Sequence, residues 1–177
     1  MSEQWILQKA ALLVPLVLSL SVHELAHART ALAFGDPTAR NSGRCTLNPL
    51  AHLDPVGTLA ILFIGFGWAK PVPVNVNNLR PRKWGDIAVS LAGPLSNLLL
   101  AVVFTGAYAV AVRALGADSG HPLVFMAWMG IVLNVILAVF NLIPVPPLDG
   151  SWIASWGLPR RLGEAYDKLI GPYGYWI

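Results

Sequence analysis

Four apolar stretches dominate the pattern of hydrophobic and polar residues along this chain. Residues 10–34 are apolar outside a short polar cluster between His23 and Arg29, and residues 87–112 and 122–148 contain no charged side chain over 26 and 27 positions. Because a helix needs roughly 20 apolar residues to cross the hydrocarbon core of a bilayer, these three stretches predict transmembrane helices. The remaining stretch, residues 56–69, has only 14 uncharged positions. It is short for a full crossing.

The composition supports a membrane protein. Hydrophobic residues make up 55% of the 177 residues and charged residues only 12%, about half the charged share of an ordinary soluble domain. Such a chain cannot cover its surface with polar groups, so we expect lipid to cover part of it, and a soluble enzyme is excluded. We predict one polytopic α-helical membrane domain over residues 1–177, with its core at residues 6–157.

The charges and the single cysteine narrow the range of ligands. A net charge of +3 without a long basic run predicts no nucleic-acid partner. Cys45 is the only cysteine, which excludes an intramolecular disulfide and a cysteine-based zinc cluster. No small-residue cleavage site follows the first apolar stretch, so we expect no removable signal peptide.

Residues 36–85 differ in composition from the apolar stretches, because they contain several pairs of asparagine, aspartate, glycine and proline that favour turns. Within them, residues 70–77 alternate and carry spaced prolines, which favours an extended edge strand or polyproline geometry over a helix. We predict a turn-and-strand insert over residues 36–85, with the short apolar segment 56–69 at its centre.

A His-Glu-x-x-His motif lies within the first apolar stretch, at His23, Glu24 and His27. On a helix it places two imidazoles one turn apart on one face, where both can reach one zinc ion. Glu24 can act as a general base toward water at such an ion. The alternative is that these residues lie at the membrane interface. Ionisable groups at membrane depth are costly, however, and predict a function.

Asp149 is the expected third ligand, because catalytic zinc usually has three protein ligands and a water molecule. It follows Pro144, Pro146 and Pro147 and precedes Gly150. Prolines break a helix, and broken backbone at membrane depth is tolerated only where it lines a cavity or is buried in protein. The alternative is a membrane-exit turn in which Asp149 caps the following helix. Beside the His-Glu-x-x-His motif, we favour the metal-ligand interpretation.

Together these segments resemble the site-2 protease family of intramembrane zinc metalloproteases. The resemblance rests on His23 to His27 and on residues 141–150, NLIPVPPLDG. Residues 43–58, 67–75 and 92–97 are similar to a compact bacterial or archaeal branch without PDZ or CBS domains. The resemblance implies one zinc ion bound by His23, His27 and Asp149, with Glu24 as the catalytic base. It also implies that Asn141 holds the substrate backbone or the developing oxyanion.

The positive charges predict the topology. If residues 56–69 are re-entrant, the first and last long helices run parallel and the three ligands meet at one depth. The 12 basic residues then divide 2 to 10 between the two sides, whereas a full crossing gives 8 to 4 at best. The positive-inside rule favours the re-entrant arrangement. It places the active site toward the cytoplasm, in a multi-pass protein of the plasma membrane.

The expected activity is zinc-dependent cleavage of transmembrane segments of membrane-anchored proteins near the cytoplasmic side. A membrane metal transporter or metal-binding protein is an alternative that would not need Glu24, and a non-catalytic helix-binding membrane protein is another. A homo-oligomer, a regulatory membrane partner and another divalent ion at the same ligands stay open. Aromatic residues at 173–177 resemble the start of another span, so we expect further C-terminal helices.

Overall fold

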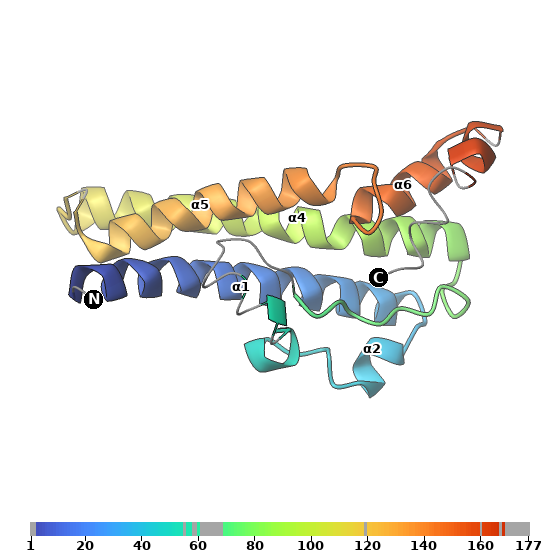
Figure 1. Cartoon of the computed structure of the whole chain (residues 1–177), viewed down its shortest axis with the longest axis horizontal. Coiled ribbons are helices and arrows are strands. Elements are labelled where there is room, and N and C mark those ends of the chain that lie inside the picture. The colour runs from blue at the N-terminus through green and yellow to red at the C-terminus, as the bar shows by residue number, and fades with distance from the viewer. Residues whose placement is uncertain are drawn as a thin grey trace.

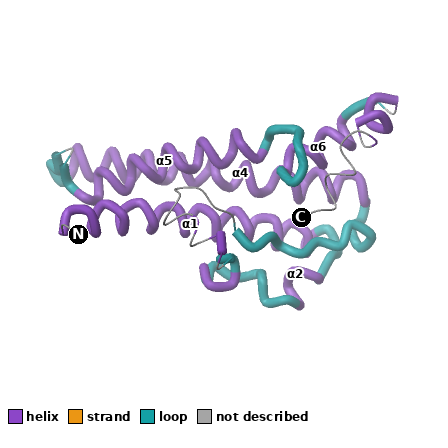
Figure 2. The backbone as a smooth tube through the Cα atoms, in the orientation of Figure 1, coloured by secondary structure: helices purple, strands orange, loops and turns teal. Residues whose placement is uncertain are grey.

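The computed structural model describes residues 3–54, 56–57, 60, 69–118, 120–159, 161–166 and 168. Over these residues the chain is mostly helical and contains no strand (Figure 2). The long helices are α1 (Glu3–Ala33), α4 (Arg82–Ala109) and α5 (Pro122–Asn141). The shorter elements are α2 (Thr38–Asn41), a 3-10 turn at Pro49–Ala51, a π-helical turn at Val110–Ala114 and α6 (Asp149–Gly157).

The three long helices form one bundle in which each helix contacts the other two. α1 and α5 run in the same direction and α4 runs against them (Figure 1). In the described part of the chain, three segments are long and apolar enough to cross a membrane: Ala11–Ala33, Arg82–Ala114 and Pro122–Asn141. The chain is therefore a polytopic α-helical membrane protein, as its apolar stretches predict.

Small residues line the helix contacts, and large apolar side chains face outward. Ala127 and Gly130 of α5 are buried, and a Cβ on Gly130 would meet the ring of Phe104 on α4. On the outer face of α4, Leu99 and Val102 are 70% and 69% exposed. Small residues let helices approach closely where no water drives their association, and lipid would cover the exposed apolar side chains.

The insert begins and ends at the same end of the bundle (Figure 1). Arg80 donates its backbone N–H to the Phe34 carbonyl at 2.8 Å, so the chain is back beside the end of α1 before α4 starts. This return makes α1 and α5 parallel. Residues 56–69 lie mostly outside the described residues, and their re-entrant path stays a prediction. α4 begins at Arg82, so residues 82–85, expected in the insert, belong to this helix.

The strand predicted within the insert is wrong for the described residues. Residues 70–75 are not helical, as predicted, but they pair with no strand. The one bridge described in the insert is isolated and joins Leu53 to Ala69. Pro71 and Pro73 lack the N–H group that a sheet ladder needs. The N–H groups of Val72 and Asn75 donate to carboxylate side chains instead.

A proline-rich turn, residues 142–148, connects α5 to α6. A Cβ on Gly150 would meet the Leu142 carbonyl, so glycine allows α6 to start against the end of α5. Trp156 donates its indole N–H to the buried Asp86 carboxylate at 2.7 Å, which joins α6 to α4. The turn therefore brings the chain back to the end of α5 and places Asp149, the first residue of α6, beside the bundle.

Candidate metal centre

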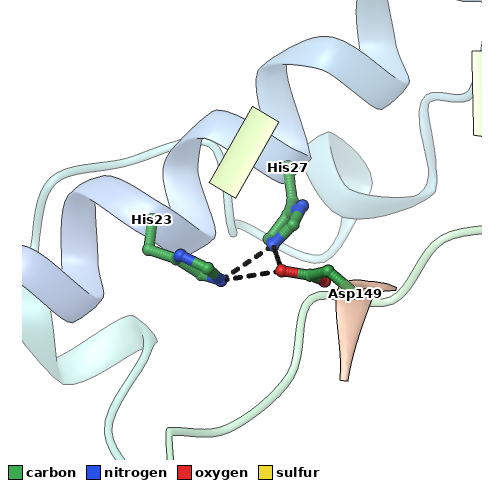
Figure 3. Close-up of side chains that lie close together, drawn as sticks. All are labelled: His23, His27 and Asp149. Atoms are coloured by element: carbon green, nitrogen blue, oxygen red, sulfur yellow. Dashed lines mark hydrogen bonds and ion pairs between the residues drawn. The ribbon is translucent and has the colours of Figure 1, made fainter. Parts of the chain in front are cut away.

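Two histidines of α1 and one aspartate of α6 converge inside the bundle (Figure 3). His23 and His27 lie one helical turn apart and are 6% and 8% exposed. Their Nε2 atoms are 3.0 Å apart, and Asp149 Oδ2 lies 3.3 Å from the first and 3.4 Å from the second. The structure thus brings together the three residues that the sequence predicts as metal ligands.

Asp149 reaches the histidines because α5 runs parallel to α1 and the turn after α5 folds back. Leu148 is the residue that precedes α6, and no side-chain hydrogen bond caps this helix. The carboxylate of Asp149 faces His23 and His27 instead. The alternative in which Asp149 only caps the next helix therefore does not hold.

The other ring nitrogen of each histidine is held by α4. His23 Nδ1 lies 2.6 Å from Asn97 Oδ1, and His27 Nδ1 lies 2.8 Å from the Val89 carbonyl oxygen. A carbonyl oxygen can only accept, so each neutral histidine carries its proton on Nδ1. Bonds of this kind orient metal-binding imidazoles and leave the Nε2 lone pair free for the ion.

With both histidines neutral in this tautomer, three acceptors face one another. Asp149 Oδ2 is buried and makes no hydrogen bond to any described residue, and the two Nε2 atoms next to it present lone pairs. A buried carboxylate oxygen is costly without a compensating charge or donor. A cation placed among the three atoms would supply that compensation.

The two histidine rings can lie against α4 because residue 93 is glycine. A Cβ on Gly93 would lie against both histidine rings, only 2.7 Å from His23 Nε2. Two imidazole nitrogens and one carboxylate oxygen are a donor set of catalytic zinc, and three protein ligands leave one position for water or substrate. The residues present thus fit a zinc ion.

One stripe of α4 organises the centre without supplying a ligand. Asp86, Val89, Gly93 and Asn97 follow at intervals of three or four residues, so they lie on one face of the helix. Asp86 holds Trp156 of α6. Val89 and Asn97 hold the two histidine rings. Gly93 leaves the space between these contacts.

Glu24 lies next to His23 on α1 and outside the ligand set. It is 9% exposed, and its Oε2 accepts the backbone N–H of Val72 at 3.1 Å. Nearby, Arg44 Nη2 donates to the Lys70 carbonyl. Because a helix turns about 100° per residue, Glu24 points to one side of its neighbour's ring. Residues 70–72 of the insert are thereby held close to this carboxylate.

Asp36 holds the same segment further along. Its carboxylate accepts the backbone N–H of Asn75 at 2.7 Å, the side-chain amide of Asn78 at 2.9 Å and the hydroxyl of Thr38 at 2.5 Å. Burial by itself raises the pKa of Asp36, but the hydrogen bonds from these three residues outweigh it and hold the pKa below its usual range. Asp36 is therefore an ionised anchor between the end of α1 and the insert.

Asn141, predicted to hold the substrate backbone or the oxyanion, is the last residue of α5. Its side-chain amide donates to the Leu137 carbonyl of the same helix at 2.9 Å. It makes no hydrogen bond to the three candidate ligands. The structure does not bring Asn141 into contact with the centre, and its role stays a prediction.

The sequence predicts Gly93 as a close-packing site, but it does not predict the contacts that Val89 and Asn97 make with the two histidines. As single polar residues in apolar stretches, Asn97 and Asn134 are predicted to join helices, and Asn97 does so while also contacting His23. The available signal was spacing, since Gly93 and Asn97 are four residues apart and share one face of a helix. No signal in the sequence assigns a role to the Val89 carbonyl, because every residue type has one.

Several known proteins are similar to this chain in sequence. The profile of Peptidase family M50 matches residues 106–170, which include Asp149. YwhC of Bacillus subtilis, named as a predicted zinc metalloprotease, is 47% identical over 171 residues, which cover 90% of this chain and 77% of YwhC. Rip2 of Mycolicibacterium smegmatis, named in the same way, is 38% identical over 172 residues, which cover 90% of this chain and 60% of Rip2.

A more distant relative comes from an archaeon. MJ0611 of Methanocaldococcus jannaschii, also named as a predicted zinc metalloprotease, is 32% identical over 136 residues, which cover 76% of this chain and 63% of MJ0611. The chain thus spans less than two thirds of Rip2 and MJ0611. No solved structure matches it. With high identity over most of YwhC and a His-His-Asp centre among membrane-length helices, the chain belongs to peptidase family M50, the site-2 protease family of zinc metalloproteases.

Proposed function

We propose that this chain is a zinc-dependent intramembrane endopeptidase that cleaves transmembrane segments of membrane-anchored proteins. The observation that supports this most is the buried convergence of His23, His27 and Asp149 among helices long enough to cross a membrane. A soluble peptide would have to enter the bilayer to meet such a centre. A segment that already lies in the bilayer is the substrate class that fits this depth.

Glu24 is the proposed general base. When bound, zinc would act as a Lewis acid that polarises the scissile carbonyl and stabilises the negative charge developing on its oxygen. Glu24 takes a proton from the attacking water as the oxygen–carbon bond forms, and gives it to the leaving amine as the carbon–nitrogen bond breaks. The hydrogen bond from Val72 holds the carboxylate in place beside His23.

Asn141 is the proposed donor to the oxyanion or to the substrate backbone. To serve in this way, its amide must exchange the Leu137 carbonyl for the substrate. We expect Asn141→Ala to lower kcat by roughly 10²–10³-fold, the usual cost of one lost oxyanion donor, while zinc affinity stays unchanged. Wild-type kcat in this variant would contradict the assignment.

The substrate is proposed to bind in an extended form along residues 70–76. A substrate helix pairs its own amides, so it must unwind locally before an amide can be cut. Residues 70–75 lie beside Glu24 and are held by charged side chains, which makes them a fixed edge for backbone pairing with an extended peptide. Val74→Pro and Val76→Pro remove N–H groups from this edge, whereas the N–H groups of Val72 and Asn75 are already bonded to Glu24 and Asp36. Cleavage that survives both substitutions unchanged would contradict pairing of this kind.

The active site is proposed to face the cytoplasm of a cell whose plasma membrane holds the protein. Ten of the 12 basic residues then lie on the cytoplasmic side, as the positive-inside rule favours. With the native free thiol removed by Cys45→Ser, a membrane-impermeant maleimide should label Lys9→Cys from outside intact cells and Arg82→Cys from the cytoplasmic side only. Labelling of both from one side would contradict this topology.

The central test is cleavage of a generic single-span substrate in liposomes. We expect cleavage by the wild-type chain and by Asp118→Asn, an exposed carboxylate in the loop before α5. We expect none by Glu24→Gln or by chelator-treated protein. Cleavage by Glu24→Gln would contradict the assignment of the base. Zinc transport without cleavage would identify a metal carrier instead.

A further inference from the structure

A buried polar chain crosses the bundle where its three long helices meet. Its members are Ser19 of α1, Asn97 of α4 and Asn134 of α5, all 0% exposed. None of them is a candidate ligand, and single polar residues in apolar helices usually serve as contacts between helices. The direction of their hydrogen bonds assigns these three polar side chains a second role, because Asn97, at one end of the row, contacts the ring of His23.

Backbone carbonyls, which can only accept, determine the far end of this polar chain. Ser19 Oγ donates to the Pro15 carbonyl at 2.5 Å, so its oxygen accepts from Asn134 Nδ2 at 2.7 Å. The same Nδ2 donates to the Gly130 carbonyl at 2.7 Å. Both protons of this amide are thereby used, and its oxygen must point the other way, toward Asn97.

The near end follows from this orientation. Asn97 Nδ2 donates to Asn134 Oδ1 at 2.8 Å and approaches the Ser19 carbonyl at 3.5 Å. Asn97 Oδ1 therefore faces His23 Nδ1 at 2.6 Å and accepts from it. Turning the Asn97 amide alone would set two oxygens against each other. Turning both amides would set Asn134 Oδ1 against the Gly130 carbonyl, so one arrangement of protons satisfies every group.

We propose that Asn97 is a positioning residue of the metal centre and that Asn134 and Ser19 determine its orientation. Through Asn97, the polar chain keeps the proton of neutral His23 on Nδ1, so that the Nε2 lone pair points toward His27 and Asp149. The inference rests on the proposed metalloprotease function. It concerns how a ligand is prepared for the metal and leaves the cleavage step as described.

The two histidines differ in this respect. His27 receives its orientation from the backbone carbonyl of Val89, which no change of side chain removes. His23 depends on the side chain of Asn97, and without it the competing tautomer, with the proton on Nε2, would block the metal position. His23 is therefore the ligand whose tautomer and ring orientation a substitution away from the metal centre can change.

Zinc affinity and the His23 tautomer test the proposal in the full chain. Affinity is measured in detergent by competition with a chelator, and the tautomer by ¹⁵N NMR of metal-free, histidine-labelled protein at pH 8. Loss of a partner of this kind typically costs 10–100-fold in metal affinity. We expect Asn97→Leu to weaken zinc binding by about 10–100-fold and to populate the Nε2–H form of His23. Asn97→Asp keeps an acceptor for His23 and should recover part of the affinity.

Two serines of α1 form a matched control. Ser19 and Ser21 each donate their hydroxyl to the carbonyl four residues earlier, but only Ser19 accepts from Asn134. We expect Ser19→Ala and Asn134→Leu to lower zinc affinity and Ser21→Ala to leave it unchanged. Equal effects of the two serine variants would overturn the proposal, and this comparison decides where Asn97→Leu does not fold.

Failure of the inference is distinct from failure of the proposed function. Wild-type affinity together with an unchanged tautomer in Asn97→Leu would overturn the positioning role, whatever the cleavage result. A wild-type chain with the Nε2–H form of His23 would do the same. Zinc binding and a tautomer that respond as expected, without cleavage of any membrane substrate, would contradict the protease and leave the positioning role in place.

Discussion

Trp156 donates its indole N–H to the Asp86 carboxylate at 2.7 Å, across the contact between α6 and α4. Asp149 stands seven residues before Trp156 on α6, two turns away and on the same face. This bond therefore helps to hold the third candidate ligand against the two histidines. Asp86 is 6% exposed, so it has little water to replace the indole if that donor is lost.

We expect Trp156→Phe to destabilise the protein and to weaken zinc binding. A buried acceptor left without its donor costs about 1–3 kcal/mol, and α6 would hold Asp149 less firmly. Thermal unfolding in detergent and a zinc titration measure the two effects. Trp152→Phe is the control, because Trp152 belongs to the same helix and is 53% exposed. Equal behaviour of the two variants would show that the bond to Asp86 has no such role.

Gly93→Ala should abolish tight zinc binding. The added methyl group would lie against the Nε2 atoms of His23 and His27, so the rings must move or the ion is displaced. Gly106→Ala is the control in the same helix, since a Cβ there meets nothing within 4 Å. The metal content of the two purified variants checks the prediction. Full zinc occupancy in Gly93→Ala would show that the ion does not lie between these rings.

Zinc should raise the unfolding temperature of the wild-type chain. A ligand that binds only the folded state stabilises it by about 2.7 kcal/mol at a free concentration of 100 Kd. We expect the same rise for Glu24→Gln, because Glu24 is outside the ligand set, and no rise for His27→Gln. Thermal unfolding with zinc and with chelator measures this. A rise that is lost in Glu24→Gln but kept in His27→Gln would contradict the assigned ligands.

Asp36 should make stability depend on pH in the acid range. Its pKa is lower in the folded chain than the unfolded value of about 3.9. The stabilisation is therefore complete above that value and is lost as the pH falls through the folded pKa. We expect the difference in unfolding temperature between wild type and Asp36→Asn to be largest at neutral pH and to shrink below about pH 4.

Asp118→Asn provides the comparison for this pH series, since Asp118 is exposed and its carboxylate accepts the backbone N–H of nearby Gly120. A gap between wild type and Asp36→Asn that stays constant from neutral pH to pH 3 would mean that the Asp36 carboxylate is not the anchor. In that case the loss would come from the altered side-chain shape alone.

The sequence predicts well where a local pattern and a physical limit coincide. Length and apolarity identify the three spans, and prolines before Asp149 predict the turn after α5. The strand in the insert fails because extended residues become a strand only when another segment supplies partners. In residues 70–75 the carboxylates of Glu24 and Asp36 take that place. The contact of Asn97 with His23 could not be predicted from the sequence, because a single amide in an apolar helix does not reveal which group it faces.

The sequence by itself determined that this is a helical membrane protein with a His-Glu-x-x-His motif and a later aspartate that could join it. Only the tertiary structure decided that His23, His27 and Asp149 meet, that Gly93 leaves them room and that Asn97 orients one ring. The physical reason is that residues 87–112 are uncharged on every side of the helix. Such a helix has no charged face to show which side turns toward water, so its rotation and register come from packing against α1, α5 and α6.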